Sequence, residues 1–266
     1  MSENSFLLHI VGAFVIGGGW VAFVTWFGEV YGSSYGGLIA GLPSTSAFSF
    51  LFIGWNQSAQ VAAEATTQFP LIFSFTGVFL LSYSLIAKRE NNFWKAELGA
   101  LLLWFLGTAL IALIDLQDFE LSLVGCVIVL VVVYLLFRKE GKVTKSPRKP
   151  ERSVPEILSR LALGGTVVAL AVITSQLAGP QVGVIPTAFP ALSTSSLYVL
   201  NKRQGLDFSR AFTLPTMVTA SLTLVPYSIA VRVFYPEVGI WWGTLIAYGI
   251  VLPCAVVAYF VLRPKS

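Results

Sequence analysis

Nine runs of mainly apolar residues constrain the fold of this chain more than any other feature of its sequence. A helix needs about 20 such residues to cross the hydrocarbon core of a bilayer, where only helices and closed barrels satisfy every backbone polar group. The runs lie at residues 6–28, 35–55, 69–87, 97–115, 120–138, 157–177, 182–201, 211–233 and 239–262. We therefore expect an all-α, polytopic helical membrane protein with nine spans.

The composition excludes the main alternatives to a membrane protein. Only 11% of the 266 residues are charged, whereas soluble domains carry about 25%. The 14% of aromatic residues argue against a disordered chain. Two cysteines, Cys126 and Cys254, and a single histidine, His9, are too few for a disulfide scaffold or for a Cys- or His-rich metal site. We expect no cofactor and no metal.

The distribution of positive charge predicts an orientation. If every run crosses, all but one of the 17 Lys and Arg residues flank the same face of the membrane, and only Arg232 lies opposite. The positive-inside rule then places the N-terminus outside and the C-terminus in the cytoplasm, in a multi-pass protein of the cell membrane. Runs 35–55 and 182–201 are rich in Gly, Pro, Ser and Thr and could be re-entrant. That arrangement would divide the basic loops between the two faces, so we expect both to cross as interrupted helices.

The chain contains an internal repeat. Residues 17–49 and 164–196 are identical at nine of 33 positions, at an offset of 147 and without a gap. Five runs lie between the starts of the two copies, so the second copy is predicted to be inverted in the membrane. Inverted repeats are a common plan of secondary transporters, although channels and some membrane enzymes share it. Five glycines of the two copies are expected to allow close helix crossing: Gly17, Gly18, Gly19, Gly164 and Gly165.

The repeat divides the chain into three parts. Residues 1–115 form the first repeat of four spans, and residues 157–266 form the second. Residues 116–156 hold a connecting span and a basic cytoplasmic loop. The proline-containing stretch 139–155 should be solvated, and we interpret its charge as a topology signal, with contact to anionic lipid as the alternative.

Prolines followed by hydroxyl residues occur at equivalent places in the two copies, in runs 35–55 and 182–201. Proline interrupts a helix and frees carbonyl groups, which within a bilayer must be buried in protein or line a cavity. Small-residue packing explains any single hydroxyl better than ligand binding does, but the pairing of two clusters favours a substrate site. The candidate substrate-binding residues are Pro43, Ser44, Thr45, Ser46, Pro190, Ser193, Thr194 and Ser196.

Ionisable residues within spans mark ion or proton paths, and this sequence has few. Glu29, near the end of the first run, and Glu64, which follows the second, are the candidates for ion or proton coupling. Glu97 and Asp115 stand at the two ends of the fourth run, so we expect both at the membrane interface.

The segment GGLIAGLPSTSAFSFLFIGWNQ, Gly36 to Gln57, followed by AAEATTQFP, resembles a family of prokaryotic multi-pass membrane proteins. The resemblance covers the first three runs best and implies a permease-like protein without an assigned substrate. LPSTSA, Leu42 to Ala47, faintly resembles the undecaprenyl-diphosphate phosphatases. The acidic pair that precedes this motif in that family and the histidine that follows it are missing here. We therefore do not expect an enzyme.

These features lead to the hypothesis of secondary transport of a small polar or neutral solute, with ion coupling as an option. The alternative is a non-transporting membrane scaffold or accessory subunit. An enzyme would require acidic or histidine groups that converge on the Ser/Thr clusters. The expected partners are the lipid bilayer and a small-molecule or ion substrate, with no nucleic acid. The sequence does not determine the oligomeric state.

Overall fold

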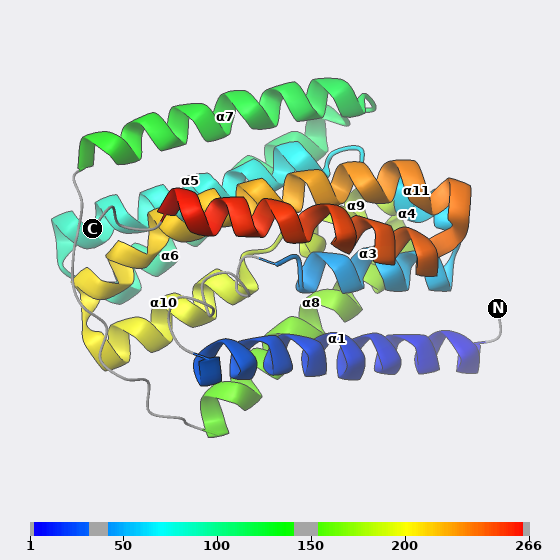
Figure 1. The fold of residues 1–266 in the computed structure, drawn as a ribbon, viewed down its shortest axis with the longest axis horizontal. Helices are drawn as coiled ribbons and strands as arrows, with labels where there is room; N and C mark the ends of the chain where they lie inside the picture. The colour runs from blue at the N-terminus through cyan, green and yellow to red at the C-terminus, as the bar shows by residue number, and fades with distance from the viewer. Residues whose placement is uncertain (1–2, 32–41, 141–153, 263–266) are drawn as a thin grey trace.

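A computed structural model describes residues 3–31, 42–140 and 154–262, and within these ranges the chain forms helices and no strands (Figure 1). Six of the described helices are long and apolar enough to cross a membrane. The all-α fold class is therefore confirmed for the described residues, and the length and composition of these helices are compatible with a helical membrane protein.

The helices follow the predicted runs closely. The first half contains α1 (Glu3–Tyr31), α3 (Thr45–Asn56), α4 (Ala59–Ala65), α5 (Phe69–Glu90) and α6 (Phe93–Ile114). The second half contains α7 (Phe119–Glu140), α8 (Val154–Ala178), α9 (Pro180–Thr187), α10 (Ala191–Gln204) and α11 (Leu206–Leu262). Run 182–201 is divided between α9 and α10, as its prolines predict. Residues 35–41 of run 35–55 lie outside the described residues, and α3 covers the rest of that run after Ser44.

Local signals explain several helix ends. The Asn92 side chain accepts a hydrogen bond from the Lys95 amide at 3.0 Å and caps the start of α6. The preceding helix, α5, ends at Asn91, whose φ of 47° is left-handed. The long helix α11 is kinked at Gly239, where φ is 81° and ψ is 169°. Glycine tolerates this conformation, and the kink lies where run 239–262 begins.

The helix α7 lies along one edge of the bundle, beside α5 (Figure 1). Most of its surface is exposed, and that surface consists largely of Val, Leu and Ile side chains. A helix that is hydrophobic all round suits lipid rather than water on its free faces. The interior of the bundle is instead formed by large buried side chains such as Phe50, Phe69, Trp104 and Tyr235.

Helices α1 and α8 cross antiparallel at a glycine contact (Figure 1). A Cβ atom on Gly18 would lie 2.4 Å from the Leu161 carbonyl oxygen, and one on Gly165 would lie 2.5 Å from the Phe14 carbonyl oxygen. Phe14 and Gly18 precede Leu161 and Gly165 by the same 147 residues that relate the two sequence copies. The two contacts are therefore exchanged by the repeat offset. The expectation that these glycines allow close helix crossing is confirmed at Gly18 and Gly165. It is wrong at Gly19, where a Cβ atom would meet no atom of another helix within 4 Å, because this residue faces away from the contact.

Candidate functional site: the crossing of two interrupted helices

The start of α3 meets the interruption between α9 and α10 inside the bundle. The hydroxyl of Ser46 donates a hydrogen bond to the Thr187 carbonyl at 3.0 Å. This carbonyl ends α9, and the chain resumes a helix only at Ala191, after Pro190, which has no N–H. The side chain from α3 thus satisfies a backbone oxygen that the helix break leaves free.

A neighbouring carbonyl of the same break is satisfied from a different helix. Thr76 on α5 donates its hydroxyl to the Ala188 carbonyl at 3.3 Å. The Thr187 hydroxyl turns back along α9 to the Gly183 carbonyl at 3.0 Å. The break is therefore lined by carbonyl and hydroxyl oxygens that α3, α5 and α9 supply together. Such oxygens suit the hydroxyl and amide groups of neutral polar solutes.

The carbonyl of Pro43, just before α3, also accepts a hydrogen bond from a side chain. The Tyr248 hydroxyl, from the second part of α11, donates to it at 2.8 Å. The Tyr248 ring packs edge-on against Tyr227, with 5.5 Å between the ring centroids. The residues just before α3 and the break between α9 and α10 are therefore each bonded to another helix through a backbone carbonyl.

Replacing Tyr248 by phenylalanine should lower the free energy of unfolding by about 1–3 kcal/mol, because the buried Pro43 carbonyl loses its donor. Unfolding of the detergent-solubilised protein by denaturant measures this change. Tyr134→Phe on the exposed face of α7 is the matched control and should change the stability little. Equal effects of the two substitutions would contradict the assigned hydrogen bond.

All the candidate substrate-binding residues lie in the described ranges. Pro43, Ser44, Ser46, Pro190 and Ser193 are buried. The other candidates, Thr45, Thr194 and Ser196, are half-buried. The hydrogen bond of the crossing ties α3 to the end of α9, whereas Ser193, Thr194 and Ser196 lie on the first turns of α10. Of these residues, Ser46 is thus brought to the interruption that Pro190 closes.

Of the two candidates for ion coupling, only Glu64 has a described side chain. Glu64 is exposed on α4 and accepts a hydrogen bond from the Gln60 side-chain amide at 3.3 Å. Glu29 belongs to the last turns of α1, and its side chain lies outside the described residues.

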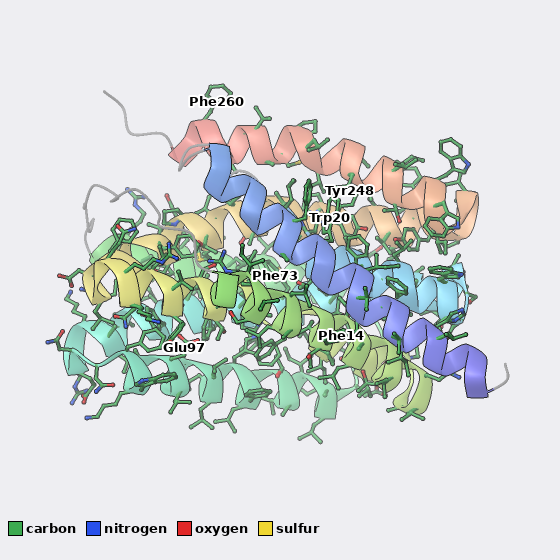
Figure 2. All side chains as sticks on the ribbon, turned by 90° about the horizontal axis from the view of Figure 1, so that it is seen from below. Phe14, Trp20, Phe73, Glu97, Tyr248 and Phe260 are labelled. Atoms are coloured by element: carbon green, nitrogen blue, oxygen red, sulfur yellow. The ribbon has the colours of Figure 1, made fainter. Side chains whose placement is uncertain are left out.

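Glu97 is buried, which corrects the expectation that it lies at the interface. Only 3% of its surface is exposed. The helix α6 begins at Phe93, a full turn earlier than the predicted run, so that Glu97 is carried inward. Figure 2 shows Glu97 on the side of α6 that faces the rest of the bundle. The capping residue Asn92 was the sequence signal for this earlier helix start.

A second polar feature lies at the other end of α9. An open pocket of about 300 Å³ is lined by three glutamines and Asp115, with Pro180 at the start of α9. The Gln117 side-chain amide donates to Asp115 at 2.7 Å and to Gln181 at 3.1 Å. Gln181 donates in return to Gln117, and the buried Gln68 amide donates to Gln181 at 3.4 Å. These amides offer both donors and acceptors without a net charge.

The polar groups of these sites are hydroxyl, carbonyl and amide groups, together with the carboxyl group of Asp115 in the pocket. Within the described ranges, no three His, Cys, Asp or Glu residues are grouped so that they could hold a metal ion. Comparison with known protein families, curated proteins and solved structures gives no match to this chain.

Proposed function

We propose that this protein is a secondary transporter of a small polar or neutral solute in the cell membrane. Nine spans, with the N-terminus outside and the C-terminus cytoplasmic, would form two inverted four-span repeats and a connecting span. The observation that carries the proposal is the hydrogen bond of Ser46 to Thr187, which joins the first turn of α3 to the break between α9 and α10. Interrupted helices at a repeat interface are where secondary transporters bind substrate.

The contacts exchanged between Gly18 and Gly165 support the repeat architecture. Helices α5 and α11 add a similar pattern. Near the end of α5, the Ser84 carbonyl accepts from Arg210 at 3.1 Å, and Arg210 lies near the start of α11. Further along α11, Arg232 donates to Thr67, just before α5, at 3.1 Å. The two helices are therefore antiparallel, as an inverted repeat requires of its equivalent spans.

The pocket of Gln68, Gln117 and Gln181 supports a neutral polar substrate. It lies beside Asp115, which the charge distribution assigns to the outer face. One short helix, α9, begins at this pocket and ends at the crossing; its eight residues span about 12 Å. The pocket would serve as the outer vestibule from which a solute reaches the interruption at Thr187.

The crossing is closed in this conformation. Ser46 is 4% exposed and Thr187 is 1% exposed, and their direct hydrogen bond occupies the groups that a solute would use. A solute would have to exchange partners with Ser46 as the two repeats move apart. The same closure favours the second candidate function, a non-transporting membrane scaffold or accessory subunit.

A ligand screen by thermal shift tests the proposal directly. Among amino acids, sugars, other neutral metabolites and Na⁺, one class should raise the Tm of the purified protein, since a ligand at 100 times its Kd stabilises by about 2.7 kcal/mol. The substitutions Ser46→Leu and Ser193→Leu should abolish this rise, because leucine fills the crossing. Ser159→Leu, at an exposed position on α8, should keep it. A rise that survives at both Ser46 and Ser193 would place the ligand elsewhere, and no rise with any class would favour the scaffold.

A further inference from the structure

We propose that Glu97 binds a proton at neutral pH and that its release couples proton movement to the motion of α10. The carboxyl group is buried on the second turn of α6, and neither of its oxygen atoms has a hydrogen-bond partner. The coupling, though not the protonation itself, rests on the proposed transport function.

The surroundings of Glu97 are apolar and uncharged. Phe93 and Ala100, one turn to either side on α6, are buried in a cluster that also contains Trp104. Tyr83 from α5 is the neighbouring titratable group, and its hydroxyl pairs with Ser209 at 2.7 Å. The side chain is thus enclosed by groups that cannot neutralise a negative charge.

The nearby cationic side chains pair with groups other than Glu97. Arg210, beside Tyr83, donates to the Ser84 carbonyl and pairs with Asp207 at 3.3 Å. At the exposed start of α6, Lys95 pairs with Glu90 at 2.9 Å. No Lys or Arg in the described part of the chain forms an ion pair with Glu97.

The Thr194 hydroxyl from α10 is the polar group that faces Glu97. It approaches the carboxyl group without reaching hydrogen-bond geometry, and its oxygen atom is also buried without a partner. A protonated carboxyl group has one O–H donor, and the threonine oxygen can accept from it. A small side-chain adjustment would therefore satisfy both groups if the carboxyl group is protonated.

Burial of an isolated carboxylate is far more costly than burial of the neutral acid. Glu97 should therefore hold its proton while the crossing is closed. A metal cation would need more oxygen ligands than one carboxyl and one hydroxyl group supply. Proton binding is thus the chemistry that this site fits.

The position of Thr194 connects the proton to the transport site. It lies on the first turn of α10, directly after the interruption at Pro190. If α10 moves relative to α6 when the crossing opens, Thr194 leaves Glu97 and water reaches the carboxyl group. The carboxylic acid then dissociates to a carboxylate and a proton, which passes to water. Return of α10 restores the dry site and requires the proton to return.

Infrared difference spectroscopy of the full-length protein in lipid vesicles tests the protonation without any solute. The wild type should show the C=O stretch of a protonated carboxyl group at pH 7, and Glu97→Gln should lack it. Glu64→Gln, at an exposed position, should keep the band. Circular dichroism and Tm verify that the variants fold. A band that remains in a folded Glu97→Gln variant, or is missing from the wild type, would overturn the proposal.

The pH dependence of the infrared band tests the role of Thr194. Thr194→Val should shift the pH at which the band disappears by about one unit, because a hydroxyl bonds more strongly to the carboxylate than to the neutral acid and valine bonds to neither. Thr194→Ser should restore the wild-type value. If neither substitution changes the pH at which the band disappears, Thr194 does not interact with the Glu97 carboxyl group.

Coupling is measured in proteoliposomes with any solute that the thermal-shift screen identifies. An imposed pH gradient should accelerate wild-type uptake, whereas Glu97→Gln should transport at a rate independent of the gradient. A gradient effect that persists in Glu97→Gln would refute the coupling. Loss of the infrared band in Glu97→Gln without transport of any solute would instead refute the transport function and leave the proton site standing.

Discussion

Replacing Gly18 or Gly165 by alanine should lower the free energy of unfolding by about 1–3 kcal/mol at each position. The added methyl group would lie 2.4 Å or 2.5 Å from a backbone carbonyl oxygen of the opposite helix. A backbone oxygen cannot rotate away as a side chain can, so α1 and α8 must separate. Denaturant or thermal unfolding in detergent micelles measures the change.

The neighbouring Gly19 provides the matched control. A Cβ atom there would have no heavy atom within 4 Å, so alanine should be accepted without strain. Gly19→Ala should even stabilise α1, by up to about 1 kcal/mol, because alanine has the higher helix propensity. If the three alanine variants unfold alike, the close crossing of α1 and α8 is wrong.

The cysteine of a Ser46→Cys variant should react with a membrane-impermeant maleimide applied from either side of the membrane. In alternating access the crossing opens to each face in turn. The native cysteines Cys126 and Cys254 are first replaced by alanine. Because a minor conformation is typically populated at 0.1–10%, labelling should be roughly tenfold to a thousandfold slower than at an exposed cysteine. Mass spectrometry of sealed, oriented vesicles measures the rate from each side.

A cysteine in place of Ala171, buried in the core on α8, is the control for local unfolding and should remain unlabelled. Labelling of position 46 from one face alone would contradict alternating access. Absence of labelling from both faces would favour the scaffold function. Equal labelling of positions 46 and 171 would report general opening of the bundle rather than a transport step.

The sequence predicted most of the described helices, although not the short helix α4, and the repeat predicted that runs 35–55 and 182–201 meet. It did not predict which atoms pair. The apolar runs predicted where helices form, and Pro190 predicted the break between α9 and α10, because these features depend on local chemistry. The repeated glycines at 18 and 165 also predicted a close crossing. In contrast, nothing in the sequence paired Ser46 with Thr187 or Tyr248 with Pro43, since those contacts depend on which helix lies opposite.

Glu97 shows that the predicted boundary of a span does not determine whether a nearby residue is buried. The apolar run begins at residue 97, so the glutamate looked like the first residue of a span. The helix in fact starts at Phe93, and the four extra residues decide both the depth and the direction of the side chain. A boundary error of one turn was enough to change an interfacial residue into a buried one.

The position of α7 at the edge of the bundle has an evolutionary consequence under the proposed inverted repeat. A half-length ancestor would have inserted in both orientations, as a dual-topology protein whose glycine helix met the same helix of its twin. Fusion of two such genes head to tail would have set both copies in one orientation unless an extra crossing separated them. An added helix that merely lies against the outside of α5 meets that need without disturbing the older dimer contact.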